Sequence, residues 1–141
     1  MEVEFVPYKK KKRIKRSTRV KYKKLAIEQA KFNVRTKAHG ICEKCIKRTK
    51  VLHGAHVQSV RHEATCADED NLMALCYHCH FNVWHKYPLE AAEWFEKKWP
   101  GRYKRLQKKA QSIVKYTDQD WKGIYEKLKE QSKNLSTDTR A

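Results

Sequence analysis

Four cysteines form two C-x-x-C pairs, Cys42 with Cys45 and Cys76 with Cys79, and 30 residues separate the pairs. This paired spacing is typical of metal ligation by thiolates, whereas five cysteines are an odd number for a disulfide framework. Four thiolates fill the tetrahedral shell of zinc and leave no open position, so the predicted site is structural. One structural Zn²⁺ would supply a large share of the folding free energy of a small domain, and chelation should loosen the fold. Cys66 has no partner at this spacing and is predicted to be a free thiol.

All seven histidines lie in the same central part of the chain, between residues 39 and 85. Because four thiolates already satisfy zinc, these imidazoles are available for a second site. Hydrolysis of a phosphodiester needs a general base to deprotonate water and a cation to stabilise the charge on the phosphate and the leaving oxygen. A neutral histidine has a suitable pKa for the base, and further histidines can hold the cation. A compact histidine-rich site could therefore carry out this reaction.

Residues 54–57, 70–72 and 75–80 resemble the zinc-containing HNH endonucleases of the ββα-metal superfamily. The signature of that family is a His, an Asn about fifteen positions later and a His about nine positions beyond it. Here 15 residues lead from His56 to Asn71 and 9 from Asn71 to His80, with the cysteine pairs on either side. Residues 84–95 are also similar to phage recombination endonucleases of the NinG/Rap type, and the resemblance covers about residues 38–106.

The resemblance implies an activity and a role for each matching residue. His56 would be the general base on the first strand, Asn71 would fix that base, and His80 at the start of the next helix would bind the catalytic cation. The implied activity is metal-dependent hydrolysis of DNA, leaving 5′-phosphate and 3′-hydroxyl ends, in phage recombination or processing. The cation would be Mg²⁺ or Mn²⁺, with Zn²⁺ as a further candidate.

The sequence departs from the family's pattern at two places. Members have Asp or His immediately before the base as a metal ligand, whereas this chain has Ala55, and we expect His53 to replace it. Strand alternation puts positions 53 and 56 on opposite faces, although a bulge at Gly54 could bring them together. His85 lies five residues after His80, about 140° around an α-helix, instead of the four found in some members. His85 could therefore be a ligand only in a distorted helix.

The charge distribution indicates a polyanionic partner. The chain carries 33 Lys and Arg against 16 Asp and Glu, a formal charge of +17, to which residues 1–38, 39–88 and 89–141 contribute +11, +1 and +5. This distribution is expected if the basic segments bind the phosphates of a nucleic acid, here DNA, while the nearly neutral centre carries out a reaction on it. A localisation signal is the alternative use of the N-terminal run. The predicted nucleic-acid-binding residues are Lys9, Lys10, Lys11, Lys12, Arg13, Lys15, Arg16, Lys97, Lys98, Arg102, Lys104 and Arg105.

The predicted fold class is α+β, with a small ββα-metal (HNH) core that carries the two cysteine knuckles between an N-terminal helix and C-terminal helices. Residues 1–18 are predicted to be a disordered basic arm, 19–112 the nuclease domain, and 113–141 a helical extension with a frayed end from residue 132. Helices are expected at about 20–37, from near His80, after Pro88, and around 101–112 and 118–131. Strands are expected within 50–57 and 71–75.

Two aromatic groups allow different interpretations. Helical spacing favours core packing over base stacking for Trp84, Trp94, Phe95, Trp99 and Tyr103. A second stripe would either pack on the domain or pair with another copy of the chain in a homodimer, and it consists of Trp121, Ile124, Tyr125 and Leu128.

Two other functions stay open at this point. A non-catalytic zinc module that binds DNA or RNA would explain the charge and the cysteines, but not the spacing of His56, Asn71 and His80. A recombination accessory protein with a decayed nuclease site is a third interpretation, favoured by Ala55. Neither a run of about 18 apolar residues nor a secretory signal is visible, so we expect a cytoplasmic protein, in the host cytoplasm if it is viral, with no membrane partner.

Overall fold

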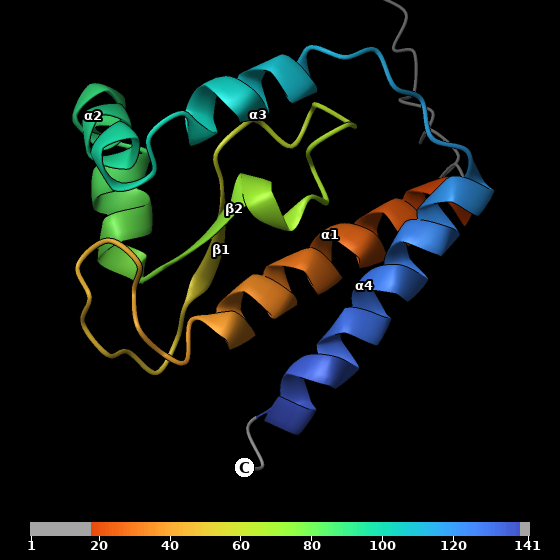
Figure 1. Cartoon of the computed structure of the whole chain (residues 1–141), viewed down its shortest axis with the longest axis horizontal. Helices are drawn as coiled ribbons and strands as arrows, with labels where there is room; N and C mark the ends of the chain where they lie inside the picture. Colours follow the sequence, from red (N-terminus) through yellow and green to blue (C-terminus); the bar gives the residue numbers. More distant parts are fainter. Residues whose placement is uncertain (1–17, 139–141) are drawn as a thin grey trace, which may run out of the picture.

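In the computed structural model of the chain, residues 18–138 are described, and they place a short β-hairpin between two long helices on one side and two shorter helices on the other (Figure 1). The predicted basic arm lies outside the described residues except for Thr18, where the first helix already begins. An α+β fold with a two-stranded sheet confirms the predicted class. The elements are α1 (Thr18–Lys37), β1 (His53–His56), the 3₁₀ turn η1 (Glu69–Asn71), β2 (Leu72–Leu75), the π-helix η2 (His78–Trp84), α2 (Pro88–Lys98), α3 (Arg102–Ala110) and α4 (Asp118–Asp138).

The hairpin supplies the centre of the fold. β1 pairs antiparallel with β2 in a continuous register that runs from His53 opposite Leu75 to His56 opposite Leu72. The bulge considered at Gly54 therefore does not form, and β1 is shorter than the predicted segment. β2 consists of four apolar residues without alternation, and all four are buried. This pattern is expected of a strand that is covered on both faces.

The two long helices run side by side (Figure 1). Small residues on α1, Ala26 and Ala30, are fully buried and allow α4 to come close, with Trp121 and Leu128 buried at the contact. The Asn33 side chain donates to the carbonyl of Leu128 at 2.9 Å and so bonds the two helices together. Of the two alternatives for the α4 stripe, the structure shows packing on the domain. α4 also continues to residue 138, past the predicted start of fraying at 132.

Helices α2 and α3 cover the other side of the hairpin. Pro88 occupies the first turn of α2, where its missing N–H costs nothing, and the helix ends before a left-handed Gly101 with φ 79°. Phe95 is buried, and Trp94 and Trp99 pack against the core beside it, which confirms core packing for this stripe. Tyr103 is exposed instead.

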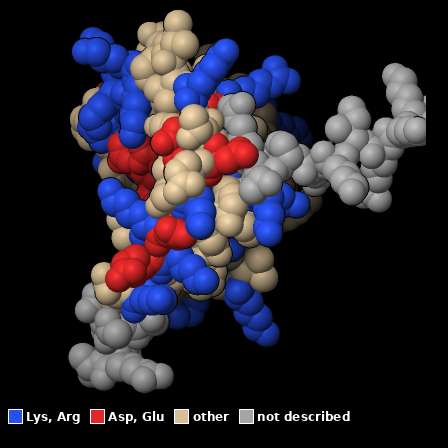
Figure 2. Space-filling model, turned by 90° about the vertical axis from the view of Figure 1, so that its right-hand side faces the viewer, with Lys and Arg blue, Asp and Glu red and all other residues tan. Residues whose placement is uncertain are grey.

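On the face that Figure 2 shows, basic side chains cover much of the surface, and groups of acidic side chains lie between them. None of the described helices is both long enough and apolar enough to cross a lipid bilayer.

Candidate active site

The four cysteines of the two knuckles come together at one end of the hairpin. Their sulfur atoms all lie within 4.8 Å of one another, and Cys45 Sγ is 3.9 Å from Cys76 Sγ. Four sulfurs bound tetrahedrally to zinc at about 2.3 Å lie about 3.8 Å apart. The cluster therefore fits one structural Zn²⁺, as the spacing predicted.

Local backbone geometry explains how the first knuckle points its sulfurs inward. Ile46 adopts a positive φ of 60°, so the chain turns sharply and the Ile46 N–H donates to the Cys42 carbonyl at 2.9 Å. The Cys76 N–H donates to Cys42 Sγ at 3.3 Å. Burial opposes ionisation of the Cys42 thiol, but backbone hydrogen bonds led by that of Cys76 lower its pKa to about 7. Cys42 can thus ionise near neutral pH, whereas burial raises the pKa of Cys45 and of Cys79.

A second cluster lies where β1 meets η2. His53 comes from the strand and His80 from the helix, and their Nδ1 atoms are 3.2 Å apart. His53 reaches His80 from a regular strand, and because the bulge at Gly54 is absent, strand alternation leaves His53 and His56 on opposite faces of β1. Burial, together with the charges that His85 and His53 can carry, lowers the pKa of His80 to about 4. His80 is therefore neutral at pH 7 and has a lone pair for a metal ion.

The distortion that His85 required is present in the helix. The N–H of His85 donates to the His80 carbonyl at 3.1 Å, a bond from residue i+5 to residue i that defines a π-helix. This register brings His85 Nε2 to 3.0 Å from His80 Nε2. His80 thus faces His53 with one ring nitrogen and His85 with the other, so the three rings form two pairs.

His56 lies at the far end of β1 with its imidazole half-buried. Its Nε2 is 2.9 Å from the carbonyl oxygen of Cys66. A carbonyl can only accept, so Nε2 carries the proton and Nδ1 keeps the lone pair. Burial lowers the pKa of His56, against the opposing hydrogen bond to Cys66. This arrangement suits a general base whose proton-accepting atom is Nδ1.

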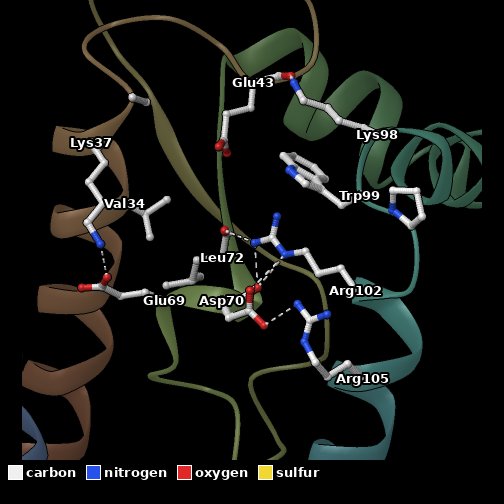
Figure 3. A pocket seen from close by; sticks show the side chains of 12 residues that line it. Val34, Lys37, Glu43, Glu69, Asp70, Leu72, Lys98, Trp99, Arg102 and Arg105 are labelled. Atoms are coloured by element: carbon white, nitrogen blue, oxygen red, sulfur yellow. Dashed lines mark hydrogen bonds and ion pairs between the residues drawn. The ribbon is translucent and has the colours of Figure 1, made fainter.

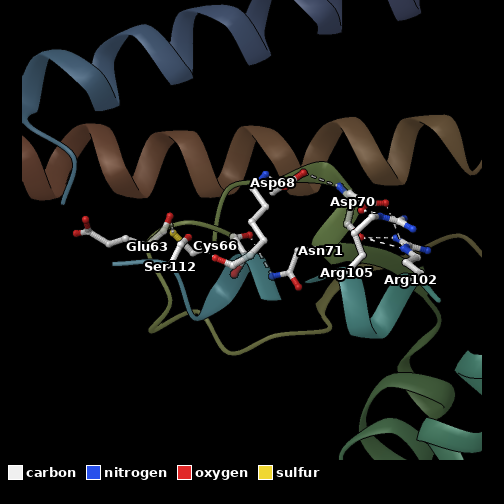
Figure 4. Close-up of polar contacts among 10 residues, drawn as sticks. Glu63, Cys66, Asp68, Asp70, Asn71, Arg102, Arg105 and Ser112 are labelled. Carbon is white, nitrogen blue, oxygen red and sulfur yellow. Dashed lines mark hydrogen bonds and ion pairs between the residues drawn. The ribbon is translucent and has the colours of Figure 1, made fainter. Parts of the chain in front are cut away.

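Asn71 is fully buried and holds the loop that follows β1. Its amide oxygen accepts from the Gln58 N–H at 2.7 Å, and its amide nitrogen donates to the carbonyls of Gln58 and Thr65 at 3.1 Å each. Gln58 lies two residues after His56, and Thr65 precedes Cys66. Asn71 therefore fixes both ends of the loop whose Cys66 carbonyl contacts His56, and Figure 4 shows it beside the segment that carries Cys66.

Sequence reasoning missed a cationic residue at this site, Lys31 of α1. A Cβ added to Gly54 would lie 2.6 Å from Lys31 Cγ, so the stem of Lys31 crosses β1 at the position of this glycine. The charge of Lys31 contributes to lowering the pKa of His56 and of His80. The glycine in the strand was the available signal, because such a glycine often marks the close approach of another segment.

The predicted phosphate-binding residues differ in how they are engaged. Arg102 is only 12% exposed, and its guanidinium donates to the carbonyls of Asp70 and Leu72 while lying over the Trp99 ring. Arg105 also pairs with Asp70 (Figure 4). Lys98 donates to the Glu43 carbonyl, Lys97 pairs with Glu93 at 3.2 Å, and Lys104 is exposed. The candidates from Lys9 to Arg16 lie outside the described residues.

A hollow of about 660 Å³ lies between α1, the start of β2 and α3 (Figure 3). Its charged groups are paired with one another, as Lys37 is with Glu69 and both Arg102 and Arg105 are with Asp70. No histidine is among the residues that line it. We therefore interpret the ion pairs around this hollow as structural contacts that join the helices to the hairpin.

Comparison of the chain with protein-family models, with curated proteins and with solved structures finds no match.

Proposed function

We propose that the protein is a metal-dependent endonuclease of the HNH type that hydrolyses phosphodiester bonds in DNA. The proposal rests on the two histidine sites at opposite ends of one short strand, one suited to bind a cation and the other to accept a proton. The excess of basic residues would hold the polyanionic substrate, and the resemblance adds a use in phage recombination or processing.

In this mechanism His56 removes a proton from the attacking water through Nδ1. The Cys66 carbonyl fixes the imidazole ring and keeps the proton on Nε2, so the accepting lone pair faces away from that carbonyl. Trp84 donates its indole N–H to the backbone carbonyl of His56 at 3.2 Å, which holds the strand end to η2. General base catalysis of this kind increases the reaction rate about 10²–10⁴-fold.

His53 and His80 would hold the divalent cation through their Nδ1 atoms. Two nitrogens bound to one ion at about 2.0–2.1 Å lie about 2.8–3.4 Å apart, and the observed 3.2 Å falls in that range. The bound cation would stabilise the negative charge on the phosphate and on the leaving 3′-oxygen. His85 would accept from the opposite nitrogen of His80 and so fix the orientation of that ring.

Lys31 would bind a non-bridging oxygen of the same phosphate. Its stem is packed over Gly54, and its side chain is only about one quarter exposed, so its ammonium cannot move far from the strand. Within residues 21–135 Lys31 pairs with Glu28 at 3.7 Å, a weak ion pair that leaves the ammonium available to a phosphate.

The facing Nδ1 atoms of His53 and His80, contributed by different elements, are the single observation that carries the proposal. The test is conversion of supercoiled plasmid to nicked or linear forms by the purified protein with Mg²⁺ or Mn²⁺. We expect the wild type to cut the plasmid and His56→Ala to cut it about 10²–10⁴-fold more slowly. The variant should still bind plasmid, seen as retarded migration in a gel.

A different result would favour the alternative function. If neither protein cuts plasmid or branched DNA, yet both bind DNA in a salt-sensitive way, the protein is a non-catalytic zinc module. Equal cutting by wild type and His56→Ala would remove His56 from the reaction.

A further inference from the structure

The structure assigns a second binding site, a groove for one unpaired nucleotide of the DNA strand, which leads to the cation-binding pair. This inference rests on the proposed function, since it concerns the substrate of the same site. The groove has a volume of about 530 Å³ and lies between the C-terminal half of α1 and the loop before β1. Its lining residues include Phe32, Arg35, Lys50, Val51 and His53.

The groove is continuous with the candidate active site. His53 lines it and is also one of the two residues whose Nδ1 atoms face each other. Lys31 is the neighbour of Phe32 in α1 and packs on β1 next to His53. A strand lying in the groove would therefore bring a phosphate towards His53 and Lys31.

The floor of the groove is held in a defined shape. The Thr49 N–H donates to the Gly40 carbonyl at 2.8 Å, and Ile41 forms a β-bridge with Arg48. Gly40 has a φ of 77°, a conformation that favours glycine and that turns the chain after α1. The site thus exists before a ligand arrives, which limits the entropy lost on binding.

Two basic side chains at the groove, Arg35 and Lys50, are available to bind phosphates. Within residues 18–138 no carboxylate pairs with Arg35 or with Lys50, in contrast to the paired bases around the large hollow beside α3. Arg35 lies four residues after Lys31, so the two project from one face of α1. Together these residues form a positive track along the groove.

Phe32 supplies a surface on which a base can stack. Its side chain is 48% exposed, although phenylalanine is usually buried, and Val51 across the groove is 63% exposed. An aromatic ring beside a positive groove is the usual arrangement in proteins that bind single strands. The bases of an intact duplex are stacked on one another and cannot reach such a ring. A groove of this volume also has the size of a pocket for one small ligand. The occupant that fits the groove is therefore an unpaired nucleotide.

The test is binding, measured by fluorescence anisotropy without a divalent cation and with the full chain carrying His56→Ala, so that cleavage is suppressed. The probes are a labelled single-stranded oligodeoxynucleotide and the same strand annealed to its complement. We expect Phe32→Ala to weaken binding of the single strand on the order of tenfold and to leave duplex binding unchanged. Phe32→Trp should keep the affinity, which shows that stacking and not folding is lost.

Matched controls separate the groove from general effects. Ile113→Ala removes another exposed apolar side chain, outside the groove, and should change neither affinity. Arg35→Gln should lower the salt slope for the single strand by about 0.7, and more than Lys24→Gln, which removes an exposed charge on the same helix. If Phe32→Ala weakened binding of both probes equally, or weakened binding of neither, the assignment of the groove to an unpaired nucleotide would be overturned. Because no step needs cleavage, a groove that passes this test would stand even if the plasmid assay shows no nuclease activity.

Discussion

Two clusters of side chains of metal-ligating types adjoin each other, with Cys79 and His80 consecutive in the chain, and they are built in opposite ways. The cysteine cluster brings all four sulfurs within 4.8 Å, and two of its members are buried. The histidine cluster meets in pairs, His53 with His80 and His80 with His85, and His85 is exposed.

The difference teaches which cluster would support the fold and which would support a reaction. A complete, closed shell leaves no position for substrate, so its free energy goes into holding the two knuckles together. A pair of imidazoles leaves most positions of an ion open to water and phosphate, as a catalytic cation requires. Substitutions in the two clusters should therefore have different effects on stability and activity.

The largest effect is expected from opening the closed cluster. Cys42→Ser removes a sulfur at the centre of the first knuckle, and apparent zinc-binding free energies of about 10–16 kcal/mol exceed the stability of most domains. We expect loss of bound zinc and of cooperative thermal unfolding, measured by elemental analysis and circular dichroism. A chelator should have the same effect on the wild type.

His53→Ala is the control for this experiment, because it changes the open cluster alone. It should retain zinc and a cooperative transition while losing cleavage. If Cys42→Ser melts like the wild type, the closed cluster does not support the fold and the contrast between the clusters is lost.

The next effect concerns the histidine shared by both pairs. His80→Ala should remove cleavage at all workable Mn²⁺ concentrations, because a catalytic cation supplies several kcal/mol of transition-state stabilisation. His85→Ala should only raise the Mn²⁺ concentration needed for half-maximal rate, by about 10–100-fold, as expected for a residue that orients a ligand. Titration of initial rates with Mn²⁺ distinguishes the two. An equal loss in both variants would instead make His85 a direct ligand.

A smaller effect is expected at Asn71, which holds the loop beside His56. Asn71→Ala would leave the N–H and carbonyl of Gln58 and the carbonyl of Thr65 without their partner, and each buried unsatisfied group costs about 1–3 kcal/mol. Allowing for loop relaxation, we expect a loss of about 3 kcal/mol in urea unfolding of the zinc-loaded protein. Asn82→Ala, at an exposed site, is the control and should cost less than about 0.5 kcal/mol. A stable Asn71→Ala protein would show that the loop is held in another way.

Sequence patterns predicted the elements and the ligands better than they predicted their geometry. The paired cysteines identified the closed cluster because ligand spacing within a knuckle is local. Helix α1 was predicted within two residues because its stop signal, His39 and Gly40, is also local, and both residues have positive φ. The π-helix was not predictable, since the insertion of one residue per turn depends on packing between η2 and β1.

Side-chain partners from distant segments were equally out of reach. The phosphate-binding role predicted for Arg102 followed from charge and helical position, but burial against Asp70 and Trp99 depends on how α3 docks. Lys31 was overlooked because it lies 23 positions before Gly54 in the chain. Tertiary packing decides which basic side chains form ion pairs and which remain unpaired.

A modest loss of stability is expected at the contact between Lys31 and Gly54. In Gly54→Ala the new methyl group would lie 2.6 Å from Lys31 Cγ and 3.2 Å from Lys31 Cα, and overpacking of this kind costs about 1–3 kcal/mol. Lys31→Ala in the same chain removes the nearest atom and should recover part of the loss, measured as a double-mutant cycle in urea. A cycle with no coupling would mean that the stem of Lys31 does not lie over the glycine in solution.

The smallest expected effect is the response of the base to mild acid. A histidine with the usual pKa of about 6.5 would be about three quarters protonated at pH 6.0. Because burial, aided by the charge of Lys31, lowers the pKa of His56, a smaller fraction of its Nδ1 should be protonated there. We expect kcat/KM at saturating Mn²⁺ to fall less between pH 7.0 and 6.0 than it would for a base with the usual histidine pKa. The same shift means that the unfolded chain binds the proton more readily, so the contribution of His56 to stability is present above pH 6.5 and is lost as the pH falls. In His56→Ala both pH dependences should flatten, whereas an acid limb centred at 6.5 in the wild type would show that the base is another, exposed group.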